Sequence, residues 1–220
     1  MDSDFWHSKW EKNEIGFHLN DVHPLLQKYF DKTFSDSSIV FVPLCGKTLD
    51  MRYLFSQHKS VIGCELSEIA ANEFFSQEQI SNELRIVKED NHHIYEVDGV
   101  TSSIKILVGD YFDLAEKSFK QCGSIYDRAA LIALPKELRL SYVKHLRELL
   151  PQAKMLLITL DYDQNQMSGP PFSVEQSEVE KLFSFANIEL LKRADIIEDE
   201  PHFKSRGVDC FYQTAYFIEW

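Results

Sequence analysis

Hydrophobic residues along this chain come in short strand-sized runs, and stretches with helical periodicity separate most of them. We expect strands at residues 39–44, 61–66, 103–108, 124–126 and 154–160, and near 188–191 and 210–218. We expect helices at 23–34, 48–57, 67–77, 137–150 and 173–186, with a short one near 113–120. Strands that alternate with helices imply parallel βαβ units, so the pattern predicts an α/β sandwich. The last two strands lack a helical crossover, which predicts an antiparallel hairpin at the C-terminus.

Turn and capping signals set the expected boundaries of these elements. Asp21, Ser67 and Ser173 are placed to cap the helices that follow them, and Asp98-Gly99 predicts a β-hairpin between 94–97 and 103–108. Residues 1–20 are rich in aromatic side chains and are expected to be irregular, and residues 79–93 are too polar to assign. There is no internal repeat, low-complexity segment or linker, so we expect one domain, 1–220.

Composition narrows the range of partners. The chain has 220 residues, a net charge of −12 and 44% hydrophobic residues, so it has enough apolar residues for one core but lacks the basic surface that nucleic acids require. No apolar run approaches the length of a membrane span, and the N-terminus has no signal-peptide pattern. The four cysteines are widely spaced, as in reduced cytosolic proteins. We therefore expect a cytoplasmic protein with a small-molecule partner, no nucleic acid or membrane partner, and a monomeric state.

A glycine turn and an acidic residue are the main candidate site. Gly46 follows the first strand, and Glu65 ends the second strand 19 positions later, where a Rossmann-like unit places the acid that binds ribose hydroxyls. A phosphate-binding loop needs a further glycine where this chain has Phe41, and no GxGxxG is present to approach a pyrophosphate. An adenosine cofactor without phosphates, S-adenosylmethionine, therefore fits better than a nucleoside triphosphate or a dinucleotide.

Two further polar segments follow predicted strands. Asp110 is placed either to contact an adenine ring or to cap the next segment. Arg128 lies at the carboxyl edge of the sheet, where it can orient an anionic substrate or pair with Asp127. The adjacent pair His92-His93 lacks the spacing of metal ligands, so we expect no metal site.

Several segments together resemble the thiopurine S-methyltransferase family, close to its bacterial members. The matching stretches are Phe5–Trp10 with Gly16–His18, Val42–Asp50, Val61–Ser67, Asp127–Pro135 and Gly169–Phe172. They occur in the family's order and extend over the chain from residue 5. The resemblance implies a Rossmann-like, seven-stranded class I methyltransferase sheet, mostly parallel, with an antiparallel last strand and helices on both faces.

The resemblance also implies roles for particular residues. Cofactor contacts are implied for Trp10, Leu44, Glu65 and Arg128, beside Gly46 and Asp110 from the motifs above. Phe17 would lie near the substrate, within an N-terminal arm and helix, 1–34, that covers the active site. The implied activity is direct transfer of a methyl group from S-adenosylmethionine to an aromatic or heterocyclic thiol.

Some alternatives stay open at this point. The acceptor could be another small soft nucleophile, including selenium or tellurium species. A nicotinamide-dependent oxidoreductase and a non-catalytic S-adenosylmethionine-binding protein are the rival classes. Residues 79–97 and 192–209 match the family weakly, so the roles of His202 and Arg206 and the use of a general base are not assigned.

Overall fold

The computed structural model describes residues 3–76 and 84–220, which fall into two compact units. The N-terminal unit ends at Ile125, and the C-terminal unit is Tyr126–Trp220. Strand β6 (Ser124–Asp127) runs from one unit into the other. The single domain expected from the sequence stays a prediction.

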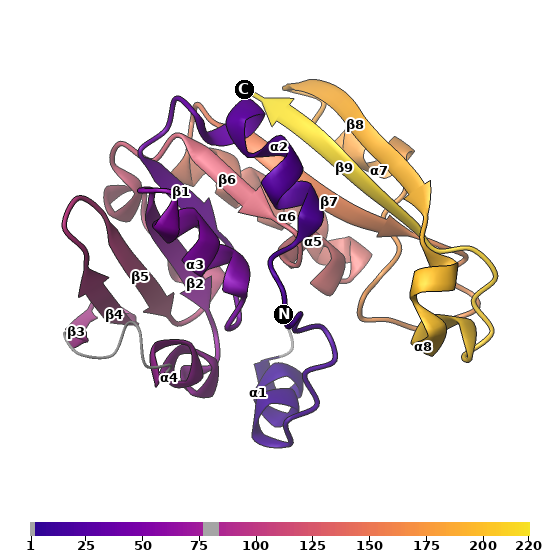
Figure 1. Ribbon diagram of the computed structural model, residues 1–220, viewed down its shortest axis with the longest axis horizontal. Helices are drawn as coiled ribbons and strands as arrows, with labels where there is room; N and C mark the ends of the chain where they lie inside the picture. The colour runs from indigo at the N-terminus through magenta and orange to yellow at the C-terminus, as the bar shows by residue number, and fades with distance from the viewer. Residues whose placement is uncertain (1–2, 77–83) are drawn as a thin grey trace. The chain divides into compact units, whose positions relative to one another are not determined.

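The N-terminal unit is built on strands hydrogen-bonded in the order β3-β4-β5-β2-β1, with the first residues of β6 next to β1 (Figure 1). The strands are β1 (Ile39–Val42), β2 (Ser60–Glu65), β3 (Arg85–Glu89), β4 (His92–Asp98) and β5 (Ser103–Val108). The helices are α1 (Ser3–Glu11), α2 (Pro24–Phe34), α3 (Leu49–Ser56) and α4 (Glu68–Ser76), with 3-10 turns η2 (Tyr111–Asp113) and η3 (Glu116–Phe119). Strands β1, β2 and β5 are parallel, whereas β3, β4 and β5 pair antiparallel.

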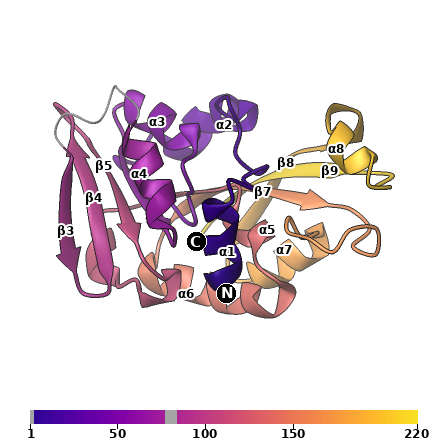
Figure 2. The ribbon, with the colours of Figure 1, turned by 90° about the horizontal axis from the view of Figure 1, so that it is seen from below.

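Apolar side chains from the parallel strands and from α3 and α4 form the core of this unit. Val40, Val61 and Ile106 are fully buried in the strands, and Leu54 and Phe74 are fully buried on the helices. Figure 2 shows α3 and α4 on the same face of these strands. The core thus holds the strand ends, and the turns that follow them, in fixed positions.

The C-terminal unit contains the antiparallel strand order β7-β9-β8, formed by β7 (Lys154–Asp161), β8 (Asn187–Asp195) and β9 (Tyr212–Glu219). Its helices are α5 (Ala130–Ala133), α6 (Lys136–Leu149), α7 (Gln176–Leu182) and α8 (Pro201–Lys204), with the 3-10 turn η4 (Ile197–Asp199). The buried Arg139 of α6 forms a 2.8 Å ion pair with Glu178 of α7. The expected C-terminal hairpin is confirmed. No helix in the described ranges is long and apolar enough to cross a membrane.

The strand count is the main correction to the expected fold. The described residues contain nine strands, not seven, and antiparallel strands flank the parallel ones of the N-terminal unit. Strand β3 lies in the segment that could not be assigned. All five of its residues are exposed, so burial imposes no alternation of apolar and polar residues on it. The hairpin predicted at Asp98-Gly99 is confirmed by the antiparallel pairing of β4 with β5.

The N-terminal region and several caps also differ from expectation. Residues 3–11 form α1 instead of irregular structure. The Nδ1 atom of His23, and not Asp21, accepts the capping hydrogen bond at the start of α2, from the backbone N–H of Leu25 at 3.2 Å. The Oγ of Ser173 accepts from the backbone N–H of Tyr162 and caps no helix. Capping residue types are common near helix starts, so residue type alone does not show which side chain reaches the free N–H groups.

Candidate cofactor site

The carboxyl ends of β1, β2 and β5 lie next to one another in the N-terminal unit. Glu65 at the end of β2 is in register with Val108 at the end of β5. Beyond the strands, the backbone N–H of Cys45 donates to the Cys64 carbonyl, and that of Gly109 donates to the Glu65 carbonyl, both at 2.9 Å. The turns after the three strands are therefore fixed around Glu65, at the edge where open α/β sheets bind ligands.

Glu65 is a buried carboxyl group with 7% of its surface exposed. The backbone N–H of Gly46 donates to its Oε2, and that of Ser67 donates to its Oε1, each at 2.8 Å. Burial raises the pKa of Glu65, and the backbone hydrogen bonds from Ser67, Gly46 and Leu66 oppose that rise. A carboxylate accepts about four hydrogen bonds. These backbone donors do not use all of that capacity, so Glu65 can still accept from a hydroxyl group of a ligand.

The turn between β1 and α3 has an unusual backbone. Leu44 has φ +47° and Gly46 has φ +55°, and a side chain is disfavoured in this left-handed region. A Cβ atom on Gly46 would lie 3.3 Å from the Cζ2 atom of Trp10, which is buried. Strained backbone of this kind is frequent at ligand sites. The glycine lets the indole of Trp10 pack directly on the turn.

Aromatic side chains from the N-terminal segment cover this turn. Phe17 lies edge-on to Trp10, with ring centroids 5.7 Å apart, and it is 39% exposed. The Nζ of Lys47 lies 6.0 Å from the centre of the Trp10 ring and 2.7 Å from a carboxylate oxygen of Glu73 on α4. The side chain of Lys47 thereby links Trp10 to α4.

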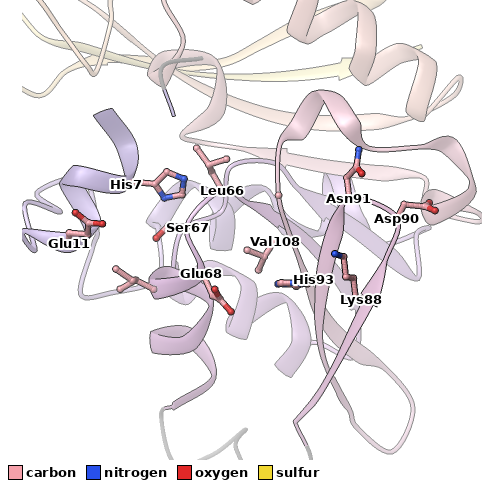
Figure 3. Close-up of a pocket in the computed structure, with 12 residues that line it drawn as sticks. His7, Glu11, Leu66, Ser67, Glu68, Lys88, Asp90, Asn91, His93 and Val108 are labelled. Carbon is pink, nitrogen blue, oxygen red and sulfur yellow. The ribbon is translucent and has the colours of Figure 1, made fainter. Parts of the chain in front are cut away.

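A cavity of about 590 Å³ lies beside Leu66, the residue that follows Glu65, and Glu65 itself does not line it. Figure 3 shows most of the residues that do. Ser67 and Glu68 line it at the start of α4, and His93, Val108 and Gly109 line it from β4 and the end of β5. His7 contributes from α1. The volume suits a small-molecule ligand. Ser67 belongs to the lining, but its Oγ is buried and makes no hydrogen bond within the protein. The volume and the polar residues of the lining fit the nucleoside part of S-adenosylmethionine.

Asp110 follows β5 and was expected either to contact an adenine ring or to cap the next segment. In the structure it caps η2: its Oδ1 accepts from the backbone N–H of Phe112 at 2.9 Å. The buried His92 supports the same loop, because its Nε2 lies 3.0 Å from the Asp110 carbonyl oxygen. A Cβ on Gly109 would lie 2.6 Å from the His92 ring, so the absence of a side chain at Gly109 allows the ring to pack against the backbone of this loop. From the sequence, His92 was considered only as a metal ligand and rejected. Its contact with this loop was not predicted.

In the C-terminal unit, Asp127 occupies the end of β6 and is fully buried. Its Oδ1 accepts from the backbone N–H of Ala130 at 2.8 Å and of Leu131 at 3.3 Å, and its Oδ2 accepts from the hydroxyl of Tyr142 at 2.7 Å. Burial raises the pKa of Asp127 to about 6. Asp127 thus fixes the start of α5 at Ala130, two residues after the partly buried Arg128.

The structure brings several predicted site residues together. Trp10, Gly46 and Glu65 form one connected group that includes the turn residue Leu44. Phe17 contacts Trp10, and Asp110 adjoins the Glu65 carbonyl through Gly109. Arg128 belongs to the other unit, so its predicted role toward the cofactor stays a prediction. Within residues 3–76 and 84–220, no group of three His, Cys, Asp or Glu side chains is arranged to hold a metal ion.

The fold is that of the class I S-adenosylmethionine-dependent methyltransferases. A methyltransferase of that kind from Anabaena variabilis ATCC 29413 is similar with a TM-score of 0.61 at 16% identity, over 99% of this chain and 94% of that chain. Magnesium protoporphyrin IX methyltransferase from Synechocystis PCC 6803 is similar with a TM-score of 0.61 at 11% identity, over 99% of both chains. At these identities the likeness concerns the fold.

The sequence defines the family. The profile of the thiopurine S-methyltransferase family matches residues 1–220. Thiopurine S-methyltransferase of Vibrio atlanticus (strain LGP32) is 44% identical, over 98% of this chain and 97% of the relative. The enzyme of that name from Pseudomonas fluorescens (strain Pf0-1) is 40% identical, over 99% of both. The chain belongs to this family. The predicted enzyme class, a methyltransferase with S-adenosylmethionine as the methyl donor, is confirmed with it.

Proposed function

We propose that this methyltransferase methylates the sulfur atom of a small aromatic or heterocyclic thiol of the thiopurine type. The acceptor class is supported by the name of the family and of the full-length relatives at 40–44% identity. The observation that supports the cofactor site is the buried carboxylate of Glu65, which accepts from the backbone N–H of Gly46, directly precedes the cavity-lining Leu66 and retains acceptor capacity.

Each residue of the site has a proposed task in binding the cofactor. Glu65 accepts hydrogen bonds from the two ribose hydroxyls, which requires its ionised form. The turn Leu44–Gly46 lets the amino-acid part approach the backbone, and Trp10 covers it. Asp110 contacts the adenine ring with the part of its carboxylate that does not cap η2.

The acceptor side rests on Phe17 and Arg128. Phe17 offers an exposed aromatic ring beside Trp10, suited to packing against a flat heterocycle and excluding water. Arg128, held at the turn that Asp127 fixes, orients an anionic acceptor or the cofactor through its guanidinium group. Both assignments follow from the family resemblance.

The chemistry requires little acid–base assistance from the chain. When bound, S-adenosylmethionine supplies an electrophilic methyl group, which a thiolate takes in line while the electron pair of the broken bond stays on the departing sulfur. An ordinary thiol has a pKa near ~8.5. Heteroaromatic thiols are more acidic because the ring delocalises the charge, so the acceptor is already nucleophilic at neutral pH. The chain then contributes alignment and exclusion of water, and alignment alone supplies roughly 7–11 kcal/mol in favourable cases.

The test is transfer of labelled methyl from S-adenosylmethionine to 6-mercaptopurine by the purified protein. Thiol-dependent label transfer supports the proposal, with omission of the thiol as the control. Selenite, tellurite and simple aliphatic thiols, offered in parallel, test the wider class of soft nucleophiles. Binding of S-adenosylhomocysteine without transfer to any acceptor would contradict the proposed acceptor class and favour a binding protein. Binding of NAD in place of S-adenosylhomocysteine would favour an oxidoreductase.

A further inference from the structure

Asn91 carries a hydrogen-bond acceptor that the chain does not use. The residue is exposed and lines the cavity from the turn between β3 and β4 (Figure 3). Its Nδ2 donates to Oδ2 of Asp113 in η2 at 3.2 Å. An ionised carboxylate only accepts, so the amide must face Asp113 with its NH₂ group and keep Oδ1 turned away from it. Within residues 3–76 and 84–220, this Oδ1 accepts no hydrogen bond.

The turn that contains Asn91 packs directly against the loop that follows β5. The Asn91 carbonyl oxygen would lie 3.1 Å from a Cβ atom on Gly109, and Nε2 of His92 lies 3.0 Å from the Asp110 carbonyl oxygen. Gly109 lines the same cavity as Asn91. Since Asp110 is the residue proposed to contact the adenine ring, Asn91 adjoins the part of the cavity that the edge of this ring would occupy.

The ordinary reason for an asparagine between two strands is the turn itself, because asparagine tolerates a positive φ. In this turn Asp90 has that conformation, with φ +52°, and Asn91 does not. The side chain of Asp90 is also occupied, since Nζ of Lys117 pairs with it at 2.6 Å. The bond to Asp113 accounts for the NH₂ half of the Asn91 amide, and the oxygen of that amide is available to a ligand.

We propose that Asn91 determines specificity for the purine base of the cofactor: its Oδ1 accepts a hydrogen bond from the 6-amino group of adenine. The inference rests on the proposed cofactor site and assigns recognition of the base to the turn between β3 and β4. The amino group has two N–H donors, so Asp110 and Asn91 can each accept one. A 6-oxo purine would place a second acceptor opposite Oδ1, and Asp113 prevents the amide from turning over to donate.

The experiment measures by calorimetry the dissociation constants of two compounds, S-adenosylhomocysteine and S-inosylhomocysteine, in which an oxo group replaces the 6-amino group. The wild type is expected to bind the inosyl compound about tenfold or more weakly, because a hydrogen bond is replaced by a contact between two acceptors. Asn91→Ala is expected to weaken S-adenosylhomocysteine about fivefold and to leave the inosyl compound within about twofold. The ratio of the two constants therefore falls in this variant.

Two further variants test the orientation of the amide and the specificity of the effect. In Asp113→Asn the new amide can donate to Oδ1 of Asn91 as well as accept from Nδ2, so the Asn91 amide is no longer held in one orientation. The ratio in this variant is expected to lie between those of the wild type and Asn91→Ala. Asn165→Ala is the matched control: Nδ2 of Asn165 likewise donates to a carboxylate, that of Asp163 at 2.9 Å, and Asn165 is exposed but does not line the cavity. It is expected to bind both compounds as the wild type does.

Three results would overturn the inference. Equal affinity of the wild type for the two compounds would mean that the site does not recognise the 6-position of the base. An Asn91→Ala ratio equal to that of the wild type would remove Asn91 from this recognition, even if both compounds bound more weakly. A wild-type ratio in Asp113→Asn would overturn the part given to Asp113. Each of these results leaves the cofactor site itself in place, whereas a wild type that binds neither compound would contradict the proposed cofactor site.

Discussion

Two buried acids at the ends of parallel strands, Glu65 and Asp127, differ in how the chain satisfies them. Burial raises the pKa of both. Asp127 accepts two backbone N–H groups on one oxygen and the Tyr142 hydroxyl on the other. Glu65 accepts from the backbone N–H of Gly46 on one oxygen and from that of Ser67 on the other, and it directly precedes the cavity-lining Leu66. Burial and a raised pKa therefore do not identify a binding acid by themselves, and the proposed role of Glu65 rests on the hydrogen-bonding capacity that it retains.

The largest expected effect separates the two acids by their response to amide substitution. Glu65→Gln is expected to weaken S-adenosylhomocysteine about 100-fold, because the amide cannot accept both ribose hydroxyls and loses the charge that strengthens those bonds. Calorimetry well below the melting temperature measures the loss.

Asp127→Asn is the matched comparison for that substitution. The amide keeps one oxygen for the backbone donors, and its NH₂ group can donate to the Tyr142 oxygen instead of accepting. Affinity for S-adenosylhomocysteine is expected to stay within about threefold of the wild type. Equal losses of affinity in the two variants would mean that Glu65 has no greater role in binding than Asp127.

Removal of a donor from Asp127 should affect stability and not binding. Tyr142→Phe is expected to lower the free energy of unfolding by about 2 kcal/mol at pH 7, the typical worth of a hydrogen bond to a charged group. Urea denaturation measures this value. An unchanged midpoint would show that the Tyr142 hydroxyl does not support the buried carboxylate.

The pH dependence of stability gives the third test. The pKa of Asp127 is about 6 in the folded protein, against the ordinary value of 3.8. Between these values the folded state binds the proton more tightly, so stability rises as the pH falls from 7 to 5. Relative to Asp127→Asn, the wild type is expected to gain about 1.3 kcal/mol over that interval. Urea denaturation of both variants at the two pH values measures it, and parallel curves would place the pKa of Asp127 near its ordinary value.

The smallest expected effect concerns the backbone donor to Glu65. Gly46→Ala forces a side chain into the left-handed region and toward Trp10, and it is expected to lower stability by about 1 kcal/mol and to weaken S-adenosylhomocysteine several-fold. Gly207→Ala is the control, because Gly207 has φ +88° and open space around it. The control should lose similar stability but keep its affinity. A loss of affinity in both variants would mean that general destabilisation weakens binding.

The predictable parts of the fold are those in which burial imposes a pattern. Strands β1 and β2 are apolar along nearly their whole length, with little alternation of apolar and polar residues. The first leads into a glycine turn and the second ends in an acid, and the sequence located both strands. Strand β3 was not predicted from the sequence. All of its residues are exposed, so its pairing with β4 produces no pattern of apolar residues along the chain. Helix α1 was missed since, within 3–11, Trp10 alone is buried, so no apolar stripe marks it.

The candidate site divides in the same way. Gly46 and Glu65 were predictable because their chemistry requires that spacing along two adjacent strands. The hydrogen bonding of Ser67 was not predictable: its residue type and position predict a side-chain cap of α4, but in the structure its buried Oγ accepts no capping hydrogen bond. The support of Asp110 by His92 depends on the pairing of β4 with β5, which brings together groups 18 residues apart.

The burial of three cysteines has a consequence for an enzyme that handles a reactive methyl group. Cys45 lies within the turn that would face the cofactor, and a thiolate there would compete with the acceptor for alkylation. Burial raises the pKa of the Cys45 thiol well above its ordinary value, helped by the charge of Glu65, and burial likewise raises the pKa of Cys64 and Cys122. The neutral thiol is a poor nucleophile. Burial, with the carboxylate proposed to hold the donor as a smaller contribution, therefore keeps the Cys45 thiol neutral beside the proposed cofactor site.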